Sequence, residues 1–270
     1  MAELKGQTSM TLLDQLKAVV TERLADLDGV VALAEEHGNL APHLFCAGDD
    51  LSTLVLGPRY PIALTVRQLL KHHPGARLGV VARGCQERAL IELANWKQLD
   101  MAQIEVIGIP CTAELAVDCR CDVPYPTQLA VGERVEGVQN PLLAEFQAAK
   151  TREQRMAFWQ HQFAKCIKCY GCRNICPLCF CETCAMEDEV FVDRGRLPVP
   201  FPTFHLIKAL HTAGSGKCVG CHACEDACPA DIPLSLLYTL LRQDLKSTFG
   251  YDAGKQTVGA PPVLMGEGRE

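Results

Sequence analysis

The stretch from Cys166 to Cys184 reads CIKCYGCRNICPLCFCETC and holds seven cysteines in nineteen residues. Its first four cysteines follow the spacing C-x2-C-x2-C-x3-C, and Pro177 comes directly after the fourth. A second run, CVGCHACEDACP, repeats this spacing from Cys218 and again ends in proline, at Pro229. Chance does not account for two copies of a four-cysteine pattern in one chain.

The spacing indicates ligands for iron–sulfur clusters. In bacterial two-cluster ferredoxins, the first three cysteines of each run bind one [4Fe-4S] cluster and the fourth binds the other cluster. We therefore predict two [4Fe-4S] clusters, each with three ligands from one run and one from the other. The first would be held by Cys166, Cys169, Cys172 and Cys228, and the second by Cys218, Cys221, Cys224 and Cys176.

Two other uses of these cysteines fit less well. Disulfides need an oxidising compartment, and the N-terminal residues MAELKGQTSM lack the apolar core of a signal peptide. Structural zinc favours paired C-x2-C knuckles over four-cysteine runs that end in Cys-Pro. Sixteen cysteines that must remain thiolates instead predict a cytoplasmic, reducing and anaerobic setting.

Composition narrows the class of protein. The chain has 270 residues, a net charge of −6 and 48% hydrophobic residues, which is typical of one or two folded domains. No basic face with interleaved aromatic residues favours nucleic acid as a partner. No apolar run reaches the ~18 residues that a membrane span requires, so we expect no span.

The first half of the chain has the pattern of an α/β domain. Residues 11–24 show the spacing of an amphipathic helix, and residues 38–50 are predicted to be a loop that contains His43 and Cys46. Beyond this loop, short apolar runs alternate with helical patterns, which predicts a parallel sheet with right-handed crossovers. The expected strands are residues 54–56, 78–82 and 104–109, and the expected helices are residues 61–72 and 86–99.

This topology predicts a third site at the edge of the sheet. Cys85 follows the second expected strand and Cys111 follows the third, so both should lie at the carboxyl edge, where α/β proteins bind ligands. Cys119 and Cys121 could fold back to the same place and complete a site for a further cluster or for zinc. Arg59 and Arg83 lie at the same edge. The alternative is that these are four separate thiols.

The second half is predicted to carry the two cysteine runs between helices. We expect helices at residues 142–165, at 204–211 and after Pro233, although a ferredoxin built of strands remains an alternative. The fold class is thus an α/β N-terminal domain with a parallel sheet, followed by a helix-rich dicluster ferredoxin-type domain. The expected boundaries are residues 1–140, 141–245 and an irregular tail at 246–270.

Three cysteines remain between the two runs: Cys179, Cys181 and Cys184. Their closeness predicts a further cluster, a zinc site or reducible thiols, with a fourth ligand from Cys46, a histidine or a partner subunit. His205 and His211 lie on an apolar helix, where satisfied core or boundary histidines are more common than ligands.

Three segments together resemble one family. They are RGCQERALIELANWKQLD with IEVIGIPC, the run that begins CIKCYGC, and FPTFHLIKALHTAG with CVGCHACEDACPADIPLSLLY. In these segments, across roughly residues 50–245, the chain resembles the coenzyme F-420 hydrogenase/formate dehydrogenase beta-subunit family, in its bacterial form with a dicluster ferredoxin domain. The resemblance implies an electron-transfer subunit beside a catalytic hydrogenase, formate dehydrogenase or heterodisulfide-reductase-like subunit, and hence a hetero-oligomer.

Three functions follow as hypotheses. The first is an iron–sulfur electron-transfer (beta) subunit of an anaerobic oxidoreductase complex, which relays single electrons and carries out no bond chemistry itself. The second is a subunit that binds FAD and reduces a deazaflavin or nicotinamide coenzyme, because some members of the family do so. The third is an assembly scaffold that metal stabilises.

Overall fold

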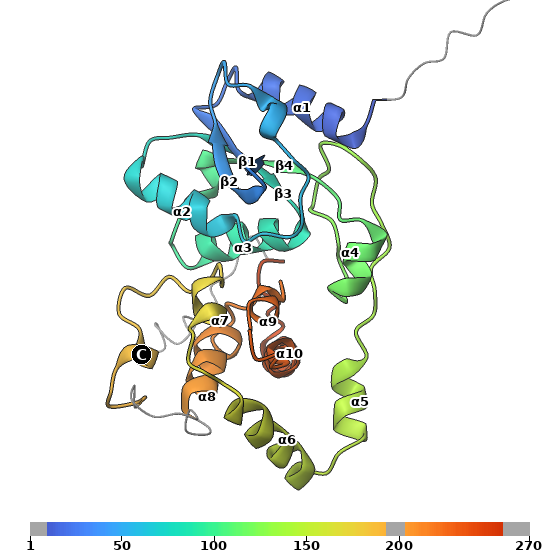
Figure 1. The fold of residues 1–270 in the computed structure, drawn as a ribbon, viewed down its shortest axis with the longest axis vertical. Helices are drawn as coiled ribbons and strands as arrows, with labels where there is room; N and C mark the ends of the chain where they lie inside the picture. Colours follow the sequence, from blue (N-terminus) through green and yellow to red (C-terminus); the bar gives the residue numbers. More distant parts are fainter. Residues whose placement is uncertain (1–9, 193–202, 256–270) are drawn as a thin grey trace, which may run out of the picture.

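The computed structural model describes residues 10–192 and 203–255. Its sheet has the strand order β2-β1-β3-β4 (Figure 1). β1 pairs with β3 and β3 with β4 in parallel, whereas β2 is antiparallel to β1. The strands are β1 (Gly29–Glu36), β2 (Asn39–Phe45), β3 (Leu78–Ala82) and β4 (Ile104–Gly108).

The sheet is therefore mixed: the predicted parallel pairing is confirmed for β1, β3 and β4, and β2 adds an antiparallel edge strand that was not predicted. The expected strand at residues 54–56 is absent, because the chain there forms a 3-10 turn (Leu51–Thr53) and Leu54 makes only an isolated bridge to Ala34. The expected loop at residues 38–50 is largely β2. β1 and β2 form a hairpin that turns at His37 and Gly38, both with positive φ, as tight hairpin turns require.

Helices cover both faces of the sheet. α1 (Leu12–Arg23) begins with a capping box between Thr11 and Asp14 and packs Leu16 and Val20 on one face. α2 (Ala63–His72) and α3 (Gly84–Asn95) pack Val66 and Leu90 on the other face. Alternate residues of the strands face these two cores, so the sheet is buried on both sides.

The crossover from β3 to β4 agrees with the expected order of elements. β3 occupies the expected residues, and β4 ends one residue before the expected end. α3 begins at Gly84 rather than Gln86 and ends at Asn95 rather than Leu99. Its early start places Cys85 in the first turn of α3, at the carboxyl end of β3.

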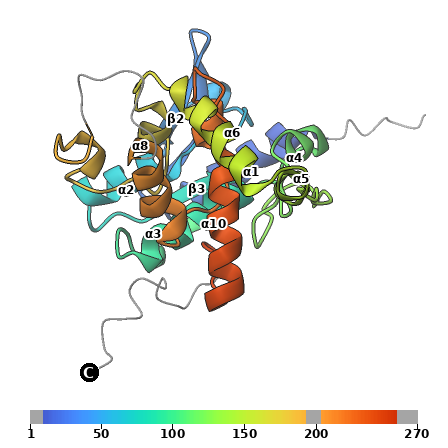
Figure 2. The same cartoon turned by 90° about the horizontal axis from the view of Figure 1, so that it is seen from below.

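The described residues after β4 form helices and loops without strands. The predicted helix at residues 142–165 is broken into two, because Thr151 caps the second one. The helix expected at residues 204–211 ends earlier as an α-helix and continues as a π-helical turn, Leu210–Gly214. The helices are α4 (Ala113–Asp118), α5 (Leu142–Ala148), α6 (Arg152–Ala164), α7 (Gly171–Asn174), α8 (Thr203–Ala209), α9 (Ala223–Asp226) and α10 (Leu234–Phe249), with α10 the longest (Figure 2).

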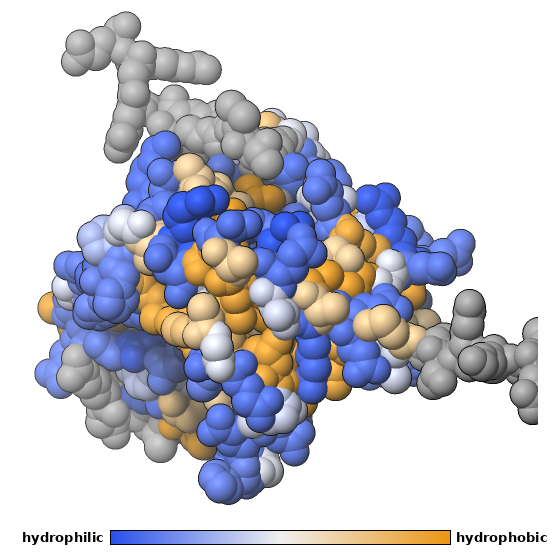
Figure 3. All heavy atoms as spheres, turned by 90° about the horizontal axis from the view of Figure 1, so that it is seen from above, coloured by the Kyte–Doolittle hydropathy of each residue, from blue (hydrophilic) through white to orange (hydrophobic). Residues whose placement is uncertain are grey.

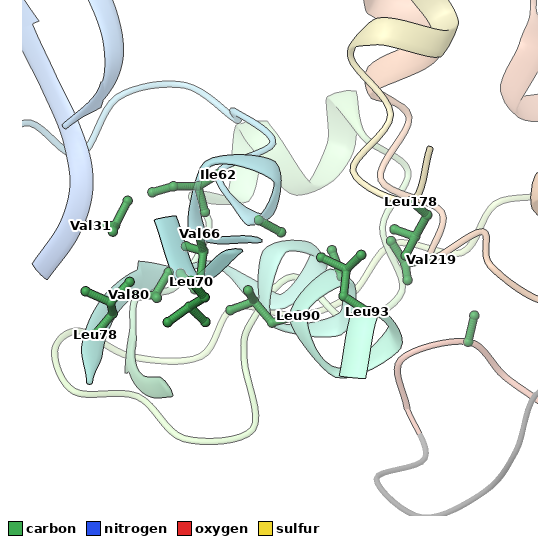
Figure 4. Packing of buried hydrophobic residues seen from close by; sticks show 14 of the residues in the cluster. Val31, Ile62, Val66, Leu70, Leu78, Val80, Leu90, Leu93, Leu178 and Val219 are labelled. Carbon is green, nitrogen blue, oxygen red and sulfur yellow. The ribbon is translucent and has the colours of Figure 1, made fainter. Parts of the chain in front are cut away.

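The two cysteine runs share a hydrophobic core with the α/β half. Leu178, which follows the first run, and Val219, inside the second run, pack into the same cluster as Leu93 of α3 (Figure 4). Burial of these side chains joins the two halves, and Arg59 adds an ion pair with Asp226 and a hydrogen bond to the Cys221 carbonyl. The positions of the cysteine runs relative to the sheet are therefore fixed by packing.

A buried carboxylate ties the segment after α10 to α3. Glu92 has no exposed surface and accepts hydrogen bonds from the Tyr251 hydroxyl (2.8 Å), the Trp96 indole (2.8 Å) and the Gly254 amide (2.9 Å). Burial raises the pKa of Glu92, while these donors oppose that rise. Residues 251–254 were expected to be irregular; they are held by this carboxylate. Residues 256–270 of the expected tail lie outside the described residues.

The surface carries both polar and apolar residues. Seen from above, apolar residues lie in strips between hydrophilic ones (Figure 3). In the part of the chain that the structure describes, no helix is long and apolar enough to cross a bilayer.

The contact between Tyr251 and Glu92 makes a testable contribution to stability. We expect Tyr251→Phe to lower the free energy of unfolding by about 1.5–3 kcal/mol, the range for a hydrogen bond to a charged group. The measurement is the urea midpoint under anaerobic conditions. Tyr60→Phe is the control, because the Tyr60 hydroxyl forms no hydrogen bond to a described residue; equal losses in both variants would contradict the assignment.

Candidate functional site

The two cysteine runs adopt the same local backbone. Lys168 and Tyr170 in the first run have positive φ, and Gly220 and His222 have it at the matching positions of the second. This conformation turns the backbone so that amides point at sulfur: the Lys168 amide donates to Cys166 Sγ, and the Gly220 amide to Cys218. Each run then enters one short helix, α7 or α9, and these two helices pack together.

Because α7 packs against α9, the fourth cysteine of each run lies with the first three cysteines of the other run. Cys172 of the first run interacts electrostatically with Cys166, Cys169 and Cys228, and burial together with these thiols raises its pKa to about 11. We name these four residues set 1. Cys228 is the last cysteine of the second run, so set 1 takes three thiols from one run and one from the other.

The second group mirrors the first. Cys224 interacts with Cys221, Cys218 and Cys176, and burial, followed by these thiols, raises its pKa well above the usual value. We name these four residues set 2. Burial and neighbouring thiols thus oppose ionisation of Cys172 and Cys224 by raising their pKa, and a bound metal centre would favour ionisation by stabilising the thiolates.

The third group lies at the carboxyl edge of the sheet. Cys85 stands at the start of α3, Cys111 after β4, and Cys119 and Cys121 in the segment after α4. All four line one small pocket, and we name them set 3. Burial and the other three thiols raise the pKa of Cys111 to about 12, although Arg83 opposes this. The topology thus brings together cysteines that no sequence spacing links.

Arginines surround set 3. Arg59 and Arg83 line its pocket, and an Arg88 nitrogen lies 3.8 Å from Cys121 Sγ. Arg83 and Arg88 are both 5% exposed, and the Nε of each has no hydrogen-bond partner among the described residues. Buried guanidinium groups with free donors require negative charge nearby. A cluster ligated by four thiolates carries such charge, so the residues present fit it.

A buried lysine lies between sets 1 and 2. Lys208 of α8 is 2% exposed, and its ammonium stands 5.7 Å from the centre of the Tyr238 ring. Burial would lower the pKa of Lys208, but the thiols around it raise that pKa above the usual value. These thiols come from both sets and from the segment between the runs: Cys176, Cys179, Cys224 and Cys172. An ammonium buried among thiols is again a sign of an anionic centre.

The three sets lie next to one another in space, in the order set 1, set 2, set 3. Cys221 of set 2 lines the pocket of set 3 and interacts electrostatically with Cys85. Lys208 in turn faces Cys224 of set 2 and Cys172 of set 1. Set 2 is therefore the middle member, adjacent to set 3 on one side and to set 1 on the other.

The remaining cysteines gather less closely. Cys179, Cys181 and Cys184 line one cavity of about 330 Å³ together with His211, but Cys46 does not line it. Cys179 also shares a hydrogen bond with Cys176, which lowers the pKa of Cys176 to about 5 and raises that of Cys179. Among the residues described, no three His, Cys, Asp or Glu side chains are placed to hold a single metal ion.

His205, on α8, is buried and packs against aromatic side chains. His205 is 3% exposed, stacks on Phe163 at 4.3 Å, and has no hydrogen-bond partner for either ring nitrogen among the described residues. Burial lowers its pKa to about 4, so the ring is neutral. The expectation that core histidines here would be satisfied was wrong for His205, which packs as an aromatic ring.

Sequence reasoning missed Lys208 and Arg88. Each lies in a helix that also contains apolar residues, and the basic residue of such a helix is ordinarily expected on its solvent-exposed face. In the FHLIKAL stretch the lysine shares a helical face with Phe204 and is as buried as that residue. A lysine on the apolar face of a helix is the signal that could have identified it.

Comparisons with known proteins give two relatives. The chain is 35% identical over 143 residues to the F420-dependent formate dehydrogenase subunit beta of Methanocaldococcus jannaschii, which covers 52% of this chain and 37% of the relative. It is 34% identical over 145 residues to the F420-dependent formate dehydrogenase 1 subunit beta of Methanococcus maripaludis, covering 53% and 36%. No family model matches the chain.

The chain spans a little over a third of the length of the curated relatives it matches. Identity near 35% to both relatives, over about half of this chain, agrees with the resemblance that the cysteine-rich segments indicated. Over this matched half, the chain is similar to the beta subunits of F420-dependent formate dehydrogenases.

Proposed function

We propose that this chain is an iron–sulfur electron-transfer subunit of an anaerobic oxidoreductase complex. The observation that carries the proposal is the succession of three four-thiol sets, each adjacent to the next. When bound at such thiols, a [4Fe-4S] cluster accepts and releases one electron at a time. The names of the two relatives support formate dehydrogenase as the kind of complex.

The chain's own residues would set the properties of this relay. The amides of Lys168 and Gly171 donate to sulfurs of set 1 at 3.4 Å each, and such bonds stabilise the reduced state. Arg59 and Arg83 would do the same for set 3 through their charge. The apolar core around Cys172, which includes Phe163 and Leu237, keeps water from the first set.

A catalytic partner follows from this proposal. In this proposal electrons would enter at one end of the relay and leave at the other. A hetero-oligomer with a catalytic subunit is the arrangement that fits a beta subunit, as both relatives are named.

Metal analysis of oxygen-free protein tests the proposal. Three [4Fe-4S] clusters predict about twelve irons and about twelve sulfides per chain, with neither zinc nor flavin needed for them. Cys85→Ser should reduce this to about eight irons and leave sets 1 and 2 loaded. Protein that contains no iron when prepared without oxygen would contradict the proposal, and an unchanged iron content in Cys85→Ser would remove the third cluster.

The exchange of the fourth ligand gives a reciprocal prediction. Cys228→Ser should damage the cluster of set 1, and Cys176→Ser that of set 2, because each residue belongs to the run of the opposite set. Electron paramagnetic resonance of dithionite-reduced protein would distinguish the two clusters. Each variant serves as the control for the other; loss of the same signal in both would show that the ligands are not exchanged.

The buried lysine gives a prediction for the reduction potentials. Lys208→Met removes a positive charge beside sets 1 and 2 while keeping the length of the side chain. Reduction adds negative charge, so we expect both potentials to fall by about 59 mV or more, a tenfold change for a one-electron couple.

The matched control is Lys217→Met. Lys217 is also buried, but it lies over the rings of Trp96 (4.5 Å) and Phe180 (4.7 Å). Redox titration of this variant should show potentials close to those of the original protein, and Lys208→Arg should largely preserve them. Unchanged potentials in Lys208→Met would refute the role assigned to this residue.

A further inference from the structure

A cationic pocket lies beside sets 2 and 3. It has a volume of about 210 Å³ and opens between α10, the segment after α4, and the loop from Cys218 to Cys221. Its walls come from parts of the chain that are far apart in sequence. The charged side chains in these walls are Arg88, Arg120, Arg242, Lys246, Lys255, Asp122 and Asp252.

Positive charge is in excess in this pocket. Five basic side chains face two carboxylates, which leaves three uncompensated positive charges in a protein whose net charge is −6. Asp252 pairs with Arg242 (3.3 Å), Lys246 (3.1 Å) and Lys255 (3.3 Å), so one carboxylate serves three cations. Their attraction holds the pKa of Asp252 below its usual range despite burial, which opposes this.

Arg88 forms the floor of this pocket. It is 5% exposed, donates from one nitrogen to the Val123 carbonyl, and leaves Nε without a partner among the described residues. Neither Arg88 nor Arg120 forms an ion pair with a carboxylate in the described ranges. Arg88 also lies beside Cys121 of set 3, so its guanidinium lies between that set and any anion held in the pocket.

We propose that this pocket binds a small molecule through its phosphate groups. Guanidinium and ammonium groups that converge in a concave site recognise phosphate by charge-assisted hydrogen bonds. The pocket is large enough for a diphosphate, and its uncompensated charge matches the two to three negative charges that a diphosphate carries. Thr239 and Gln243 of α10 provide further hydrogen-bonding groups.

The position of the pocket indicates what such a molecule would do. Cys121 of set 3 and Gly220, between two cysteines of set 2, both line it. A phosphate-bearing molecule held there would lie beside both sets. The significance of this position rests on the proposed function, whereas binding of phosphate does not.

Calorimetric titration of the oxygen-free protein with inorganic pyrophosphate tests the proposal. We expect saturable binding with a dissociation constant below about 1 mM, weakened by salt. Arg120→Gln and Lys246→Gln should each weaken it roughly tenfold, the loss expected for one charge-assisted hydrogen bond. Lys246→Arg should retain binding.

The control is Lys71→Gln. Lys71 resembles Lys246 in exposure (59% against 62%) and in being paired with an acidic residue, Glu182, but it lies on α2, away from the pocket. The Lys71→Gln variant should bind pyrophosphate with the affinity of the original protein. Absence of saturable binding, or equal binding by all variants, would overturn the proposal.

Two additional measurements separate the sources of failure. ADP that competes with pyrophosphate and binds at least as tightly would identify a nucleotide as the ligand, whereas binding of pyrophosphate alone would identify a free diphosphate. Iron is determined in the same samples. Iron without pyrophosphate binding rejects this pocket and leaves the relay intact; binding without iron rejects the relay and leaves the pocket.

Discussion

Buried positive charge is the constraint on which the rest of this structure depends. Lys208, Arg83 and Arg88 are almost fully buried. Thiols surround Lys208 and one lies beside Arg88, whereas Arg83 faces thiols of set 3 and also donates to the carbonyls of Leu56, Gly57 and Pro58. Burying a cation that lacks an anionic partner costs several kcal/mol, so negative charge on the neighbouring sulfurs would stabilise these positions. The buried cations and the cysteines would thus stabilise each other, because each would supply charge opposite to that of the other.

The shared core makes this arrangement rigid. Val219 sits between two cysteines of the second run and packs against α3, and Leu178 does the same just after the first run. Because α3 also carries Cys85 and Arg88, the same packing that buries these apolar side chains brings set 3 beside set 2. Rigid placement of redox centres suits electron transfer, in which little atomic movement accompanies each step. The proposed relay would therefore depend on the hydrophobic core as much as on its cysteines.

Parts of the fold were predictable because their signals are local. β3, β4 and the helix between them follow from apolar runs bounded by turn residues. The hairpin of β1 and β2 was missed because its turn, His37-Gly38, lacks the usual Asn-Gly or Asp-Gly signal, and because β1 is apolar almost throughout. The break after Ala148 was missed because apolar spacing continues across it, while Thr151 caps a new helix.

The sequence by itself determined which cysteines form the two four-cysteine runs, because the spacing of the cysteines in a tight turn is local information. It also placed Cys85 and Cys111 after neighbouring strands, because the order of strands and helices prescribes which ends meet. Only the tertiary structure decided that Cys119 and Cys121 join them, that Lys208 lies between two sets, and that basic residues from four segments form one pocket. Those contacts join residues far apart in the chain, and no local pattern encodes which distant side chains will share a buried site.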